Sequence, residues 1–192
     1  MTIKLNWFGL AGGALTIIVV AISLFAPWWK LTAGDNFITT SLSPFTTDLT
    51  ILGTAVTFPI IWAANLAIIF SLVAAGIIMI IYSVAPTKSY AKQLLDFSYN
   101  KPLFSVIAFV ILLFAMTLIF QLLLNLNIPL SGTTTSTLPR GMTQGINVSV
   151  NVSAAFQWPF WLAATASGLC IAAKLYHRKI VKPNNTPLAS KN

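Results

Sequence analysis

Four long apolar runs constrain this 192-residue chain more than any other feature. They cover residues 7–26, 58–83, 102–124 and 156–176, and Lys174, near the end of the last run, is their one charged side chain. About 20 apolar residues at 1.5 Å per residue span a hydrocarbon core about 30 Å thick. The runs therefore predict an all-α membrane protein with a bundle of four transmembrane helices.

The composition supports this class, because 57% of the residues are hydrophobic and 7% are charged, whereas soluble domains carry about 25% charged residues. If the N-terminus is cytoplasmic, the outer segments hold only Lys30 and Arg140 of the 11 basic residues. This positive-inside bias predicts that both termini are cytoplasmic. The net charge is +8, and the basic cluster near the C-terminus is expected to contact anionic lipid headgroups rather than nucleic acid.

The chain divides into a single membrane domain over residues 1–181 and a polar C-terminal tail over residues 182–192. The exterior loops are residues 28–57 and 125–155. The inner loop contains residues 90–97, which can form a short helix lying at the membrane surface. The polar tail is expected to be disordered by itself.

The exterior loops predict a small extracytoplasmic β-sheet. Residues 29–33 and 37–42 are β-prone and flank the trio Gly34-Asp35-Asn36, which predicts a hairpin. Further short strands are possible at residues 50–52 and 55–57. Residues 146–153 alternate strictly, which predicts a strand with its valines covered and its asparagines facing outward. Because a lone hairpin is marginal in water, strands from both loops are expected to join in one sheet.

Tryptophans flank the apolar runs, where their amphipathic rings are expected to anchor at the headgroup level. These interfacial anchors are Trp7, Trp28, Trp29, Trp158 and Trp161.

Small residues recur at four-residue spacing, which lets helix backbones approach closely in a membrane. The residues assigned to helix packing or assembly are Gly9, Gly13, Ala67, Ser71, Ala164 and Gly168. They are expected to pack inside the bundle, and the alternative is a dimer or partner interface.

No catalytic, metal-binding or cofactor-binding pattern is evident, so an enzyme is not the favoured class. His177 is the single histidine and Cys170 the single cysteine, whereas metal sites need more than one donor. Asn65 and Gln121 are expected to form an interhelical hydrogen bond, and the alternative is contact with a quinone or another small polar ligand.

Asn147 and Asn151 begin two N-x-S sequons on the exterior strand and are possible glycosylation sites. The chain has only three acidic residues, and its outer segments are rich in Thr, Ser and Asn instead. Carboxylates titrate near pH 4, so they add little solubility in strong acid. This composition indicates an acidophile, such as a thermoacidophilic archaeon, or else ordinary scarcity of charge in a membrane protein.

The layout resembles the claudin-like tetraspan arrangement, with four helices, inner termini, an outer sheet from both outer loops, and Trp29 in the first loop. The paired loop cysteines of claudins are absent. The sequence favours a non-catalytic membrane protein acting through protein–protein contacts, either as an accessory subunit of a larger complex or as a surface component that assembles laterally with itself. The alternative is a small subunit of a quinone-linked membrane oxidoreductase.

Overall fold

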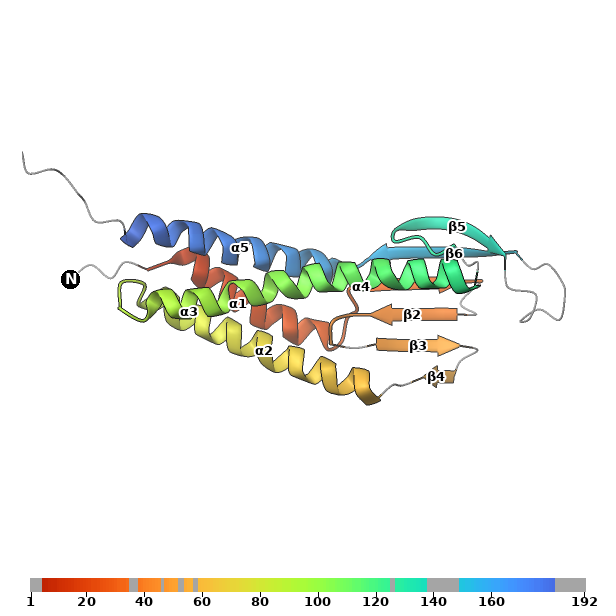
Figure 1. Ribbon diagram of the computed structural model, residues 1–192, viewed down its shortest axis with the longest axis horizontal. Coiled ribbons are helices and arrows are strands. Elements are labelled where there is room, and N and C mark those ends of the chain that lie inside the picture. Colours follow the sequence, from red (N-terminus) through yellow and green to blue (C-terminus); the bar gives the residue numbers. More distant parts are fainter. Residues whose placement is uncertain are drawn as a thin grey trace, which may run out of the picture.

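The protein is mostly helical, with an antiparallel sheet at one end of a helical bundle (Figure 1). The computed structural model describes residues 5–34, 38–45, 47–51, 54–56, 59–124, 127–137 and 149–181. Within these ranges the helices are α1 (Trp7–Ser23), α2 (Pro59–Val84), α3 (Ala91–Ser98), α4 (Asn100–Leu124) and α5 (Trp158–Val181). The strands are β1 (Trp29–Ala33), β2 (Ile38–Leu42), β3 (Thr47–Ile51), β4 (Thr54–Val56), β5 (Gly132–Thr137) and β6 (Ser149–Phe156).

The sheet contains strands from both segments that the sequence predicted to share one sheet, residues 28–57 and 125–155. Its strand order is β4-β3-β2-β1-β6-β5, and every neighbouring pair is antiparallel. The predicted hairpin is confirmed as β1 paired with β2, and Trp29 lies opposite Leu42 on β2 and Phe156 on β6. The pairing of β1 with β6 joins residues about 120 positions apart in the sequence and confirms the single sheet.

The β6 strand keeps the predicted alternation but lies further along the chain. Val152 is buried and Asn151 is exposed, while Val150 is only half-buried. The strand continues to Phe156 because its second half pairs with β1 along its whole length. Residues 146–148 of the predicted strand lie outside the described part of the chain.

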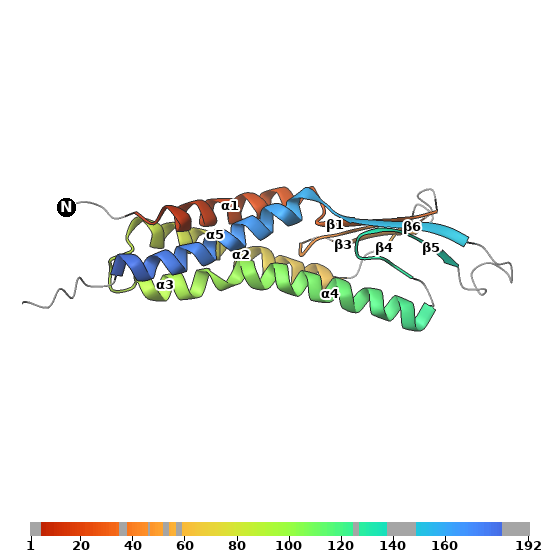
Figure 2. The ribbon, with the colours of Figure 1, turned by 90° about the horizontal axis from the view of Figure 1, so that it is seen from above.

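Helix α1 packs against both α2 and α5, and α4 packs mainly against α5 (Figure 2). The predicted inner-loop helix is confirmed as α3, and it runs almost directly into α4, since Tyr99 is in the right-handed helical region and donates to the Leu95 carbonyl. The stretches Asn65–Val84 and Ala91–Ile119 are long and apolar enough to cross a membrane. Helix α1 is apolar too but has 17 residues. It ends at Ser23, three residues before the predicted end, as the chain approaches Pro27.

Glycines let α1 approach its neighbours closely. A Cβ on Gly13 would lie 2.8 Å from the Gly76 carbonyl oxygen of α2, and one on Gly9 would collide with Ser83 Oγ. On the α5 side, a Cβ on Gly12 would lie 3.0 Å from Cys170 Sγ. Gly9 and Gly13 therefore lie directly against α2.

The other predicted packing residues are less uniform. Ala67 and Gly168 are exposed, and nothing lies within 4 Å of a Cβ built on Gly168. Ser71 and Ala164 are half-buried. The buried small side chains of α5 are instead Ala163, Ala166, Ser167, Cys170 and Ala173. Four-residue spacing alone did not identify the packed face of α2 or α5.

Candidate functional site

Two adjacent tryptophans connect the bundle to the sheet. Trp28 and Trp29 are 1% and 0% exposed, so neither can reach lipid headgroups, and the prediction that they are interfacial anchors is wrong. Both side chains are covered because the chain turns at this point from α1 into the centre of the sheet. Trp7, Trp158 and Trp161 are 68%, 59% and 60% exposed, as an anchor at the membrane surface must be.

Each buried indole has a hydrogen-bond acceptor, as buried tryptophans generally do. Trp28 Nε1 donates to Ser23 Oγ at 2.7 Å, and Trp29 Nε1 donates to the Leu130 carbonyl at 2.8 Å. The Trp28 backbone also forms hydrogen bonds at the ends of both neighbouring strands, because its N–H donates to the Leu42 carbonyl and its carbonyl accepts from the Gln157 N–H. Around the Trp28 ring lie Phe45, Phe109 and Phe160, all edge-on with centroids 5.2 to 6.1 Å away. The Trp28 ring therefore contacts α4 and α5 as well as the segment after β2, and so connects the sheet to the bundle.

A groove formed by described residues lies between α2 and α4. It has a volume of about 620 Å³, which lies in the usual range for ligand sites. Its walls are the end of β2 and the segment after it, the part of α2 from Asn65 to Leu72, and the first two-thirds of α4. The lining residues are Leu42, Ser43, Pro44, Asn65, Ile68, Ser71, Leu72, Lys101, Phe104, Ser105, Ala108, Phe109, Leu112, Leu113 and Met116. Most of these side chains are apolar.

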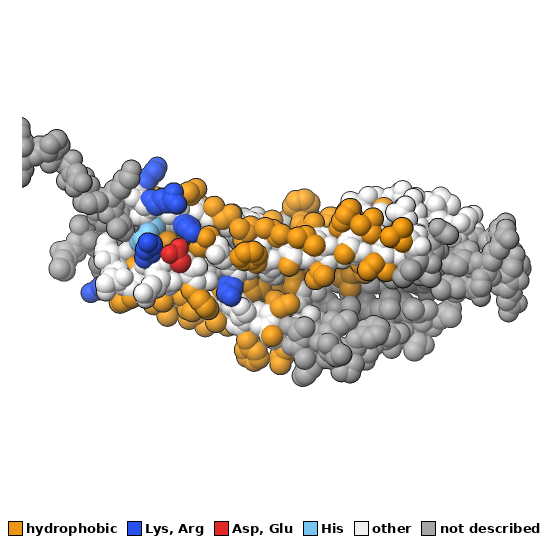
Figure 3. Space-filling view, viewed as in Figure 1, with side chains coloured by type: hydrophobic (Ala, Val, Ile, Leu, Met, Phe, Trp, Pro, Cys, Tyr) orange, Lys and Arg blue, Asp and Glu red, His pale blue; other side chains and the backbone are white. Residues whose placement is uncertain are grey.

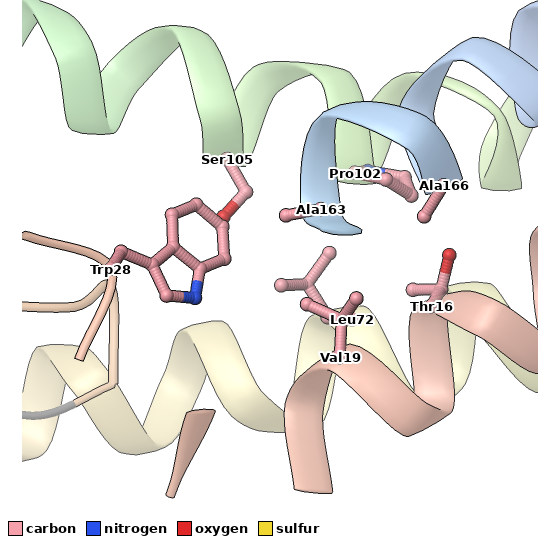
Figure 4. Close-up of a pocket in the computed structure, with 8 residues that line it drawn as sticks. All are labelled: Thr16, Val19, Trp28, Leu72, Pro102, Ser105, Ala163 and Ala166. Atoms are coloured by element: carbon pink, nitrogen blue, oxygen red, sulfur yellow. The ribbon is translucent and has the colours of Figure 1, made fainter. Parts of the chain in front are cut away.

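A second, much smaller cavity adjoins the groove at Leu72 and Ser105 (Figure 4). Its volume of about 10 Å³ is at the lower limit for one water molecule. One of its two hydroxyls, on Thr16, already donates to the Gly12 carbonyl at 2.7 Å. The other, Ser105 Oγ, is buried without a hydrogen-bond partner among the described residues, and it points toward the Trp28 ring in Figure 4. This cavity is a packing defect, whereas the groove can hold a molecule.

Charged side chains gather at the end of the bundle that carries α3 (Figure 3). Lys174 Nζ lies 3.4 Å from Asp96 Oδ1 and 3.5 Å from the centroid of the Tyr99 ring. Lys101, which lines the groove, lies two residues further along the chain than Tyr99, and its Nζ is 5.2 Å from the centroid of the Phe97 ring. The Lys174–Asp96 pair is the single ion pair among the described residues.

His177 lies at this same end and has no partner that would make it a ligand site. Its ring packs edge-on against Tyr82 at 5.5 Å, and its buried Nδ1 has no hydrogen-bond partner in the described chain. Burial lowers the pKa of His177 below its ordinary value of 6.5, while Asp96 raises this pKa and Lys92 lowers it. The imidazole is therefore neutral at pH 7. The described residues include no group of three or more His, Cys, Asp or Glu side chains that could hold a metal ion.

The remaining predicted site residues are dispersed. Asn65 lines the groove, whereas Gln121 is exposed on α4 and is not part of the lining, so the structure does not bring the two together. Asn151 is exposed and its side-chain oxygen accepts from Thr135 Oγ1 at 3.2 Å. Asn147 lies outside the described residues. Glycosylation stays a prediction.

The sequence analysis missed Asn6, which is completely buried at the charged end of the bundle. Its side-chain oxygen caps α1 by accepting from the Gly9 N–H, and its amide donates to Tyr82 Oη at 2.8 Å and to the Ala173 carbonyl at 3.0 Å. One residue therefore ties α1 to both α2 and α5. An asparagine directly before an apolar run is a typical helix N-cap, and that signal was present in the sequence.

Comparison with known proteins adds no assignment, because no protein-family model matches the chain and no curated protein is significantly similar to it.

Proposed function

We propose that this protein is a non-catalytic integral membrane protein that presents its sheet outside the membrane and acts through protein–protein contacts. It serves as an accessory subunit of a larger membrane complex or as a surface component that assembles laterally. The observation that carries the proposal is the junction at Trp28 and Trp29, which fixes the sheet to the bundle. A buried, hydrogen-bonded connection suits a part whose task is to hold another protein in a defined position.

The membrane location is supported by large apolar side chains exposed on the outside of the bundle. Phe70, Phe104, Ile111, Leu112 and Leu122 are each more than 60% exposed. On the face drawn in Figure 3, hydrophobic side chains are spread over the described helices between the charged end and the sheet. Contiguous patches of this kind are a liability in water, whereas lipid solvates them. We propose spans at residues 7–26, 58–83, 102–124 and 156–176.

The orientation follows from the same charge distribution. The described basic side chains lie mostly at the end with α3 and the C-terminal end of α5 (Figure 3), so this end is assigned to the cytoplasm. Both termini are then cytoplasmic and the sheet is extracytoplasmic. Labelling with an impermeant thiol reagent in intact cells tests this on a Cys170→Ala background. Ser149→Cys should react and Ser190→Cys should not, and the reverse pattern would overturn the orientation.

The contact function is tested by purification from native membranes in mild detergent, followed by identification of the co-eluting proteins. Lys30 and Ala155 lie opposite each other in the register and are both exposed, so Ala155→Arg should release a partner bound to this face. Lys92→Gln, on the exposed surface of α3, is the control that should leave the complex intact. A single species without partners would contradict the proposal.

The alternative is a small subunit of a quinone-linked membrane oxidoreductase. It is favoured by the apolar groove, where Asn65 could donate a hydrogen bond to a ring carbonyl. Redox-cofactor absorbance in the co-eluting complex would support this alternative over the first proposal.

A further inference from the structure

We propose that the groove between α2 and α4 is a binding site for one anionic membrane lipid of the cytoplasmic leaflet. The tail lies along α4 and the headgroup phosphate pairs with Lys101. This inference rests on the proposed membrane location but not on the identity of any protein partner.

The groove is long enough to hold an extended lipid tail. Its lining along α4 runs from Lys101 to Met116, and 15 steps of 1.5 Å between these residues give about 22 Å. One leaflet contributes about half of a hydrocarbon core about 30 Å thick, so a tail entering at the Lys101 end fits within this length. Small side chains at Ser71, Ser105 and Ala108 leave space for it, while Phe104 and Leu112 are 62% and 68% exposed beside it.

Lys101 determines which end holds the headgroup. It lies two residues from Tyr99, hence about 3 Å along the helix axis from the level where Tyr99 meets Lys174. It is therefore at the charged end of the bundle, where headgroups of the cytoplasmic leaflet are expected. Its ammonium group lies near the Phe97 ring, so it is directed back toward this end.

Lys101 also lacks a carboxylate partner in the described chain. Asp96 is the one carboxylate whose side chain the structure describes, and it pairs with Lys174. Lys101 directly precedes the proposed span at residues 102–124, where basic side chains attract anionic lipids, and a phosphate headgroup supplies the missing counter-charge. A second copy of the chain or a purely apolar helix would cover the groove but would leave this ammonium group without a counter-ion.

The proposal is tested by native mass spectrometry of the purified full chain in mild detergent, titrated with phosphatidylglycerol or phosphatidylcholine. One phosphatidylglycerol should be retained, with a Kd about five-fold lower than that of phosphatidylcholine, since one basic residue near a lipid surface contributes about this factor. Lys101→Gln should abolish the difference between the two lipids. Lys179→Gln removes the same charge from an exposed position on α5 and should preserve it. Equal loss in both variants would overturn the site.

A second measurement does not depend on the folding of any variant. A phosphatidylglycerol with a photoactivatable tail should form adducts with wild-type residues 101–116 and not with the exposed face of α5. Ala108→Phe, which places a ring in the groove from an exposed position, should remove these adducts. Adducts spread evenly over the helices, a cross-link to a second copy, or a bound quinone in place of the lipid would each refute the proposal.

Co-flotation with vesicles tests the membrane location and the lipid site separately. A chain that floats but shows no preference for phosphatidylglycerol refutes the lipid site alone. A chain that does not float refutes the membrane location and the lipid site together.

Discussion

The close approach of α1 to α2 gives the sharpest stability prediction. In Gly13→Ala the new Cβ would lie 2.8 Å from the Gly76 carbonyl oxygen and 2.9 Å from Ile80 Cγ1. The first contact involves backbone, so the helices must separate, and overpacking of this kind typically costs about 1–3 kcal/mol. Alanine also favours the helix over glycine by about 1 kcal/mol, so the single variant measures the sum of two opposing effects.

Gly168→Ala isolates the gain in helix propensity. Gly168 is also helical, but nothing lies within 4 Å of its Cβ position. This variant should therefore show only the gain in helix propensity, and should be more stable than wild type by up to about 1 kcal/mol. The difference in unfolding free energy between the two variants is then the cost of the α1–α2 collision, about 1–3 kcal/mol.

Thermal unfolding of both variants in the same mild detergent measures this difference, with particle size recorded on the same samples. At about 2–4 °C per kcal/mol for a chain of this length, Gly13→Ala should melt roughly 2–12 °C below Gly168→Ala. Particle size should be unchanged. Equal melting temperatures would show that the backbones are not this close, and dissociation of a larger particle without a change in protomer melting would place Gly13 at an interface between chains.

Three further outcomes follow from single side chains. Asn6→Ser keeps a capping oxygen but removes the amide that donates to Tyr82 and Ala173, so the unfolding free energy should fall by about 1–3 kcal/mol. Chemical denaturation would measure this change. An unfolding free energy equal to that of wild type within error would show that these hydrogen bonds are dispensable. Val152→Asp should destabilise the protein by more than about 1 kcal/mol, because it buries a charge. Ser149→Asp, at an exposed position of the same strand, should change the stability very little. Equal effects of the two variants in thermal melts would contradict the buried face of β6. Because the folded-state pKa of His177 is lowered, its stabilising contribution is complete above pH 6.5 and is lost as the pH falls through the folded-state pKa. Melting temperatures from pH 7.5 to 5 should therefore decline in wild type and stay flatter in His177→Phe, and parallel curves would exclude this histidine as the cause.

Local patterns in the sequence determined much of this protein. Apolar runs placed the long helices to within a few residues at most of their ends, and α5 alone extends well past its predicted end, to Val181. Alternation and turn residues predicted β1, β2 and the outward direction of Asn151. These features depend on residues close together in the chain, so they can be predicted without knowledge of the tertiary contacts. The β5 strand was not predicted because its run of threonine and serine lacks alternation, and only its pairing with β6 makes it a strand.

Tertiary structure alone decided which apolar faces are covered. In a membrane both the lipid and the protein interior are apolar, so hydropathy does not distinguish a lipid-facing side chain from a buried one. For this reason the sequence assigned Trp28 and Trp29 to the surface although they are buried, and gave Gly168 a packing role although it is exposed. The groove beside Lys101 has the same origin, because it exists only where α2 and α4, which come from separate parts of the chain, stand apart.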